Sequence, residues 1–328
     1  MRKIIPSLDR TFDYDDISVV PRIESISASD PALHLNTKLT QNVEIKYPFI
    51  ASPMDSVINE TMAVCLRKYG MLPIFYIRAS NEKLIHFEIE EYSKKSDGRF
   101  GLCVPTDSEY INHVLSSRFS GVCEVIALDT LHSKPYNHLR TLEYLRKKFD
   151  GDIISGNILN AEDCQKVIDC GANAVRIGMT VNAVNKGYEM TGCGRRQASA
   201  VYECANVGDK NNIPVIADGG IKSIADVVKS IALGASTVMM GKLFAAIQES
   251  PAETIILNDE KYKIYKGMSR KSIVDEDMIP EGSTVQIKCS GKFDEVINTW
   301  IEILKVAVAR SGAINLEEMR ENSIIECY

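Results

Sequence analysis

Short apolar runs alternate with amphipathic stretches along most of the chain. The runs are rich in Val, Ile and Phe, which favours strands, and the stretches between them place apolar residues at a three-to-four spacing, which favours helices. The expected strands cover 49–55, where the strand runs into a polar loop, 71–77, 99–104, 123–129, 152–157, 174–178, 214–220 and 236–241. The expected helices cover 60–70, 81–95, 136–149, 161–172, 196–208, 224–235 and 293–312. This order predicts a parallel sheet covered by helices.

The number of repeating units favours one α/β fold over another. About eight strand–helix units over roughly 260 residues fit a (β/α)8 TIM barrel better than an open doubly wound sheet. No GxGxxG sequence follows the first strand, which also disfavours a Rossmann fold. We therefore expect a single barrel domain over 1–328, in which 293–328 form a C-terminal helix and tail.

Polar and glycine residues gather directly after the expected strands. They are Asp55, Asp129, Asn157, Gly178, the run Asp218-Gly219-Gly220, and Gly241. In a barrel these positions share the carboxyl-terminal rim, where active sites are built. Residues far apart in the sequence are therefore expected to meet at one site.

Composition excludes several classes of function. The chain has 45% hydrophobic and 25% charged residues and a formal net charge of −6, which argues against a general electrostatic grip on nucleic acid. No run approaches the length of a membrane-spanning helix, and the first residues turn polar too early for a secretory signal. The nine Cys are scattered without a CxxC pair or a Cys/His ligand set, so we expect reduced, mostly buried thiols, a cytoplasmic protein and no metal site.

Two glycine loops are the strongest local signal for chemistry. ADGGI (217–221) and VMMGK (238–242) each end a strand just before a helix begins. Backbone N–H groups and helix starts favour phosphate binding, and the side chain of Lys242 could pair with that phosphate. The alternative is that these glycines only make tight turns and that Lys242 is a solvated residue at a helix start.

The motifs resemble those of the IMP dehydrogenase / GMP reductase family over nearly the whole chain. The matching segments are FDYDDISVVP (12–21), ASPMDSV (51–57), LDTLHS (128–133), SGNI (155–158), RIGM (176–179), GCGRRQASAVYECA (192–205), PVIADGG (214–220), GASTVMMGKLFAA (234–246) and YKGMS (265–269). The resemblance implies a TIM barrel, a purine mononucleotide ligand such as IMP or GMP, NAD or NADP as cofactor, and a homotetramer, with neither nucleic acid nor membrane as partner.

The architecture and the motifs of the chain resemble different branches of the family. IMP dehydrogenases usually carry a pair of CBS domains near the position of 80–100, and this chain passes through that region without an insertion. The segment 281–296 and the tail 311–319 also look like GMP reductase, whereas ASPMDSV, DTLHS and VMMG look more like IMP dehydrogenase. The architecture indicates a reductase, and several motifs indicate a dehydrogenase.

The resemblance also implies roles for individual residues. Ser52 and Met54 would line the nucleotide pocket, and Asp218 would bind the ribose hydroxyls. The phosphate would lie on the backbone of Gly219, Gly220 and Gly241, and Gly267, Met268 and Ser269 would close over the purine. Asp129 would meet the nicotinamide ribose, and Asn157 and Gly178 would lie at the base and the cofactor face. Glu281 occupies the position of an acidic residue that works with a Thr in proton transfer in the reductases.

One departure from the family pattern concerns the reaction itself. Both family reactions go through a cysteine that attacks C2 of the purine, and counting without gaps from Gly178 places Asn185 at that position. A carboxamide is not a nucleophile for this step, so the usual covalent intermediate cannot form there. The Thr and the flanking glycines of the family loop are also replaced. Cys193 matches a non-catalytic family position, and we interpret it as a packing residue rather than as a substitute nucleophile.

Two functions from different classes remain open on this reading. The first is an NAD(P)-dependent oxidoreductase of the GMP reductase type with altered chemistry or substrate, including a modified purine nucleotide handled without a thioimidate. The second is a catalytically inactive nucleotide-binding protein, a regulatory pseudoenzyme, which kept the phosphate site and lost its nucleophile. Retention of Asp129 and Glu281 favours the first. The altered reactive loop favours the second.

Overall fold

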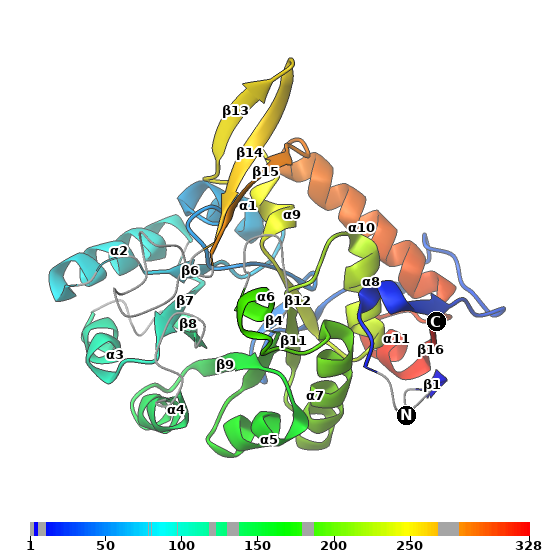
Figure 1. Ribbon diagram of the computed structural model, residues 1–328, viewed down its shortest axis with the longest axis horizontal. Coiled ribbons are helices and arrows are strands. Elements are labelled where there is room, and N and C mark those ends of the chain that lie inside the picture. The colour runs from blue at the N-terminus through cyan, green and yellow to red at the C-terminus, as the bar shows by residue number, and fades with distance from the viewer. Residues whose placement is uncertain are drawn as a thin grey trace.

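Eight parallel strands form the centre of the molecule in the computed structural model (Figure 1). The structure describes residues 3–5, 11–77, 79, 81–96, 98–117, 123–129, 138–178, 187–267 and 282–328. The strands are β5 (Phe49–Ala51), β6 (Ile74–Tyr76), β7 (Phe100–Pro105), β8 (Cys123–Asp129), β9 (Asp152–Ile158), β10 (Ala174–Ile177), β11 (Val215–Asp218) and β12 (Thr237–Met240). They pair in the order β5-β12-β11-β10-β9-β8-β7-β6, which confirms a nearly closed (β/α)8 barrel.

Helices cover the outer face of the barrel, as Figure 1 shows. They are α1 (Glu60–Lys68), α2 (Glu82–Lys95), α3 (Ser108–Leu115), α4 (His138–Arg146), α5 (Ala161–Asp169), α7 (Gln197–Asn211), α8 (Ile224–Ala232) and α10 (Phe293–Arg310), with the shorter α6 (Gly187–Thr191), α9 (Lys242–Ala245) and α11 (Leu316–Asn322). Asn59, Asn81 and Asn160 cap α1, α2 and α5 by accepting a hydrogen bond from a first-turn N–H. These side chains fix where the strand-to-helix loops end.

Two apolar clusters hold the barrel together. The inner cluster fills the barrel with one layer of side chains above another, among them Ile50, Ile74, Cys103, Ile154 and Met239. The larger outer cluster lies between the strands and the helices and includes the buried faces of α1, α8 and α10. Because both faces of the strands are buried, their sequences are apolar almost throughout rather than alternating.

A short hairpin closes the amino-terminal end of the barrel. Strands β3 (Thr37–Lys38) and β4 (Glu44–Ile45) pair antiparallel, and Leu39 and Val43 beside them belong to the inner cluster. The buried carboxylate of Asp152, at the start of β9, accepts from the backbone N–H of Asn42 at 3.0 Å and from its side-chain amide at 2.8 Å. This end of the barrel interior is therefore plugged by the hairpin.

Several elements were not expected from the sequence. Helix α3 was not predicted, because its buried side is narrow and consists of Ile111 and Val114. Strands β13 (Glu253–Leu257), β14 (Glu260–Lys266) and β15 (Thr284–Lys288) form an antiparallel sheet that projects from the barrel (Figure 1). The tail after α10 contains α11 and β16 (Ile324–Cys327), and β16 pairs with β1 (Lys3–Ile5) and β2 (Ile17–Val20) next to the short helix η1 (Tyr14–Asp16).

Candidate functional site

An arginine that the sequence analysis did not single out lies between two of the predicted site carboxylates. Arg176 on β10 is buried, and its Nη2 lies 3.2 Å from Oδ1 of Asp129 at the end of β8. Its Nε lies 3.7 Å from Oδ2 of Asp218 at the end of β11. Both ion pairs cross the barrel interior at its carboxyl-terminal end. The structure therefore brings Asp129 and Asp218 together, as expected, and adds the cation that they share.

Asn157 and Gly178 complete this side of the site. The amide nitrogen of Asn157, on β9, donates to the carbonyl of Gly178 at 2.6 Å and to Oδ2 of Asp218 at 3.0 Å. Gly178 has a φ of +147°, and a Cβ placed on it would lie 1.7 Å from the Asp218 carbonyl oxygen. Only glycine fits such a close approach of two strand ends. The predicted residues Asn157, Gly178 and Asp218 thus form one contact group.

Burial and charge act in opposite directions on this group. Burial raises the pKa of the Asp218 carboxyl above its ordinary value, while the Arg176 charge and the Asn157 hydrogen bond oppose that rise. The charge of Asp129 adds to the rise, as expected for two carboxylates in one site. Burial alone would lower the pKa of Arg176, but the two carboxylates outweigh burial and the pKa is raised. Arg176 is therefore a permanent cation between them.

A second buried side chain supports the strand ends from outside the barrel. The amide nitrogen of Gln197, the first residue of α7, donates to the carbonyl of Ile177 at 2.8 Å and to that of Asp218 at 3.1 Å. Gln197 is fully buried. Nothing in the sequence pattern distinguished it from an ordinary residue at a helix start. These two hydrogen bonds hold the backbone at Ile177 and Asp218 in place.

The other half of the site is a cradle formed by β5, β12 and β14. The hydroxyl of Tyr265 lies 3.6 Å from the sulfur of Met54, and a Cβ on Gly241 would lie 2.2 Å from the same hydroxyl oxygen. The backbone N–H of Ser52 donates to the carbonyl of Met240 at 3.1 Å. Burial raises the pKa of Tyr265, and the negative charge of Asp218 raises it further. The Tyr265 hydroxyl therefore interacts electrostatically with the first half of the site. Tyr265 is a third residue that the sequence analysis missed, although it begins the matched segment YKGMS.

The two predicted glycine loops differ in their surroundings. Gly219 and Gly220 follow β11 and are half-buried. The helix behind them, α8, is already capped, because the Asp226 carboxylate accepts from the N–H groups of Lys222 and Ser223 at 2.9 and 3.0 Å. Asp226 thus pairs with the N–H groups of the two residues before α8, and phosphate binding at this loop stays a prediction. Lys242 is the first residue of α9 and is exposed.

Four predicted site residues lie outside the described part of the chain. They are Asn185, Met268, Ser269 and Glu281. Gly267, the neighbour of two of them, is described, and its N–H donates to the carbonyl of Ser283 at 2.9 Å. Ser56, in the loop after β5, donates from Oγ to the carbonyl of Lys266 at 3.1 Å. The segment that ends at Gly267 is thus attached to the loop that carries Met54.

The interpretation of Cys193 as a packing residue is wrong. Its side chain is exposed, and its sulfur lies 3.7 Å from the carbonyl oxygen of Thr191. The exposure follows from its place in the extended segment between α6 and α7, which lies outside the apolar clusters. The two arginines that follow it are paired elsewhere, Arg195 with Glu203 and Arg196 with Asp16. Among the described residues, neither of these two arginines forms its ion pair with the Cys193 thiol.

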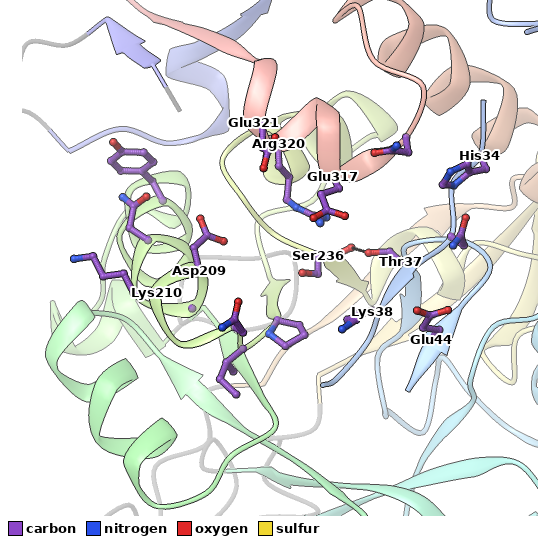
Figure 2. Close-up of a pocket in the computed structure, with 18 residues that line it drawn as sticks. His34, Thr37, Lys38, Glu44, Asp209, Lys210, Ser236, Glu317, Arg320 and Glu321 are labelled. Carbon is purple, nitrogen blue, oxygen red and sulfur yellow. Dashed lines mark hydrogen bonds between the residues drawn. The ribbon is translucent and has the colours of Figure 1, made fainter. Parts of the chain in front are cut away.

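A separate cleft of about 870 Å³ lies at the opposite, amino-terminal end of the barrel. Figure 2 shows side chains from the β3–β4 hairpin, the end of α7 and α11 around it, including Lys38, Lys210 and Arg320. Acidic side chains such as Asp209 and Glu317 alternate with the basic ones. None of the predicted site residues in the described part of the chain lines this cleft. We therefore place the candidate active site at the carboxyl-terminal rim.

The described residues contain no group of three or more His, Cys, Asp or Glu side chains arranged to hold a metal ion. No helix among them is both long enough and apolar enough to span a membrane.

Comparison with known proteins identifies the family. The family model described as "IMP dehydrogenase / GMP reductase domain" matches residues 11–327. The chain belongs to the IMP dehydrogenase / GMP reductase family. The match runs from the residues before η1 to the last strand, so it includes both halves of the rim site.

Similar proteins carry the name of one family branch. An inosine-5'-monophosphate dehydrogenase of Cryptosporidium parvum is 26% identical over 374 residues, covering 98% of this chain and 93% of the relative. The protein of the same name from Borreliella burgdorferi is 27% identical and covers 94% of this chain and 92% of the relative. The one from Halalkalibacterium halodurans is 32% identical over 308 residues, covering 87% of this chain but 63% of the relative.

Proposed function

We propose that this family member binds a purine mononucleotide such as IMP or GMP and acts as an NAD(P)-dependent oxidoreductase with altered chemistry. The observation that carries the proposal is the pair of half-sites at the rim. The group of Asp218, Arg176 and Asn157 lies beside the cradle of Gly241, Tyr265 and Met54, because strands β11 and β12 are paired neighbours. A carboxylate and a glycine cradle at adjacent strand ends suit the ribose and the phosphate of one nucleotide.

The nucleotide would use the described residues as follows. Asp218 would accept from both hydroxyls of the ribose, since a carboxylate offers two acceptor oxygens. Backbone N–H groups of Gly219, Gly220 and Gly241 would hold the phosphate, with Lys242 adding a positive charge. In the outer part of the pocket, the purine would lie against Ser52 and Met54, and Gly267 would close over it together with Met268 and Ser269.

The residues beside this pocket also fit a nicotinamide dinucleotide. The buried carboxylate of Asp129 is the other acidic partner of Arg176. Asn157 and Gly178 lie between the carboxylates of Asp129 and Asp218. Asp129 would accept from the nicotinamide ribose, and Asn157 would orient the base toward the cofactor face. The nicotinamide would supply hydride transfer. Met278 occupies the position at which the reductases place an Arg, so the resemblance does not favour NADP over NAD. The proposal therefore covers both cofactors.

The altered chemistry rests on Asn185. A cysteine thiolate divides the family reactions into two easier steps, and a carboxamide cannot replace it. Glu281 remains as the proposed acid–base group, and Cys193, whose side chain is exposed, is not assigned the role of the nucleophile in this proposal. Any turnover would then proceed without a covalent purine intermediate. The uninterrupted barrel, without a CBS pair, agrees with a GMP reductase-like architecture.

A second candidate function is a nucleotide-binding protein without turnover. It is favoured by the combination of an intact rim site with Asn185 at the nucleophile position. In either case we propose a single-domain, cytoplasmic homotetramer. The free cysteines agree with a reducing compartment.

The test is a two-step screen of the wild-type protein. Calorimetry with IMP, GMP, XMP and AMP first identifies which nucleotide binds. Absorbance at the nicotinamide band then follows each bound nucleotide with NAD, NADP and their reduced forms. Binding with hydride transfer supports the oxidoreductase, binding alone supports the second candidate, and the absence of binding by all four nucleotides contradicts both. A Lys210→Met variant in the distant cleft is the matched control and should bind as wild type does.

A further inference from the structure

The position of Arg176 points to a task that the family roles above do not include. Its guanidinium faces three strands at once, with Nη2 toward Asp129, Nε toward Asp218 and Nη1 3.8 Å from the sulfur of Met239. A planar guanidinium with several N–H groups can interact with both carboxylates at once. The side chain is 3% exposed, so water does not screen these interactions.

We propose that Arg176 is a positioning residue that keeps Asp218 ionised and aimed at the nucleotide ribose, and that it thereby sets the lower pH limit of nucleotide binding. The proposal rests on the proposed function, because Asp218 is taken as the ribose ligand. It adds a residue and a pH dependence that the proposed function does not contain.

The need for such a residue follows from the burial of the site. A carboxylic acid that must accept two hydrogen bonds from a ribose has to be ionised. Burial and the neighbouring charge of Asp129 both favour the protonated form of Asp218. The Arg176 charge is the larger of the two influences that oppose protonation, and the Asn157 hydrogen bond is the smaller.

The other titratable groups around Arg176 cannot replace its charge. On β7, the thiol of Cys103 lies 3.9 Å from Oδ2 of Asp129, and burial raises its pKa. His138, at the start of α4, has its pKa lowered to about 4, first by burial and then by Arg176. Tyr76 on β6 and Tyr265 on β14 both have raised pKa values because they are buried. Near neutral pH all four are uncharged.

The test uses three variants for which the proposal predicts different results. Arg176→Met removes the charge and keeps most of the length, Arg176→Lys keeps the charge, and Asp129→Asn removes the competing carboxylate. The affinity of the whole protein for IMP and GMP is measured by calorimetry from about pH 5 to about pH 8. Lys210→Met in the distant cleft is the control for an ordinary loss of positive charge.

The pH below which nucleotide affinity falls, the acidic limb of the affinity profile, should move in different directions in the variants. Arg176→Met should shift the limb upward by about one to three pH units, the range for loss of a close opposite charge. Asp129→Asn should shift it downward, and Arg176→Lys and Lys210→Met should leave it near its wild-type position. An equal loss of affinity at every pH in Arg176→Met, with an unmoved limb, would show a merely structural role and overturn the proposal.

Two outcomes need a separate reading. If Arg176→Met does not fold, the pH dependence of nucleotide affinity in Asp129→Asn decides the question. An acidic limb at its wild-type position in that variant overturns the proposal. If the wild type binds neither nucleotide, the proposed function fails while the inference is still tested. The pKa of Asp218 is then measured from its carboxyl ¹³C resonance, assigned with Asp218→Asn. A lower pKa in Asp129→Asn than in wild type supports the inference, and an unchanged pKa overturns it.

Discussion

The hydroxyl of Tyr265 occupies the space that a side chain at Gly241 would need. A Cβ at position 241 would lie 2.2 Å from the Tyr265 oxygen and 3.1 Å from its ring carbon Cζ. Gly241 itself has φ −90° and ψ −67°, a conformation that other residues adopt without strain. Glycine is therefore needed here because Tyr265 packs against this position, and not because of its backbone conformation.

This relationship predicts the behaviour of Gly241→Ala. The added methyl group should push Tyr265 out of the cradle and weaken nucleotide binding, with an overpacking cost on the order of 1–3 kcal/mol. Tyr265→Phe removes the closest atom, so the double variant should recover part of the affinity that Gly241→Ala loses. Calorimetry on the three variants measures the recovery. Wild-type affinity in Gly241→Ala would contradict the cradle.

The replacement of the family nucleophile predicts an inert position 185. A purine nucleotide with a leaving group, such as 6-chloropurine ribotide, should form no adduct there, and intact-protein and peptide mass spectrometry measure this. Ordinary IMP dehydrogenation and GMP reduction should be absent or several orders of magnitude slower, because the thiolate step is missing. Asn185→Cys should restore little, since the Thr and flanking glycines are also replaced. Normal turnover by the unmodified chain would refute this, and Cys193→Ala would then identify the acting thiol.

His138 predicts a pH dependence of stability. Burial lowers the pKa of its imidazole from 6.5 to about 4, and its Nε2 lies 2.7 Å from Oγ of Ser155. The folded state therefore binds this proton less well than the unfolded state. The stabilisation is fully present above pH 6.5 and is lost as the pH falls toward about 4, with a total of about 3 kcal/mol.

Chemical denaturation of wild type and His138→Gln across this pH range measures the effect. The variant should show a smaller fall in the free energy of unfolding between neutral and acidic pH. The exposed His34 provides the matched control, and His34→Gln should fall as wild type does. Equal slopes in wild type and His138→Gln would tell against the buried neutral imidazole.

Assembly is predicted from the family resemblance alone. Sedimentation velocity at micromolar protein concentration should show a tetramer, because the resemblance implies a homotetramer. A monomer as the sole species under these conditions would count against it.

The barrel was predictable from sequence because its strands are buried on both faces. The expected strand over 123–129 matches β8 in both bounds, and the helices that begin with Asn caps start within one residue of their expected positions. The β13–β15 sheet was not predictable in the same way. β13 is largely exposed and carries no alternating pattern, so its pairing with β14 depends on contacts between segments rather than on local periodicity.

The candidate site was predictable only in part. The position of Asp129, Asn157, Gly178 and Asp218 after strands was enough to bring them to one rim. Arg176 was missed because it lies inside an apolar strand, where its charge is explained only by two carboxylates on other strands. Cys193 was misjudged because a cysteine carries a strong prior for burial, although the flanking Gly192 and Gly194 and the two arginines that follow indicate an exposed loop.

The central claim is that a purine nucleotide binds at Asp218, and calorimetric titration of IMP and GMP into wild type and Asp218→Asn tests it most directly. The account predicts measurable binding of at least one nucleotide by wild type. Affinity in Asp218→Asn should be weaker by about 1–3 kcal/mol, the scale of a lost charge-assisted hydrogen bond. Lys210→Met in the distant cleft should bind as wild type does. Equal affinity in wild type and Asp218→Asn, or loss of binding in Lys210→Met instead, would contradict the account.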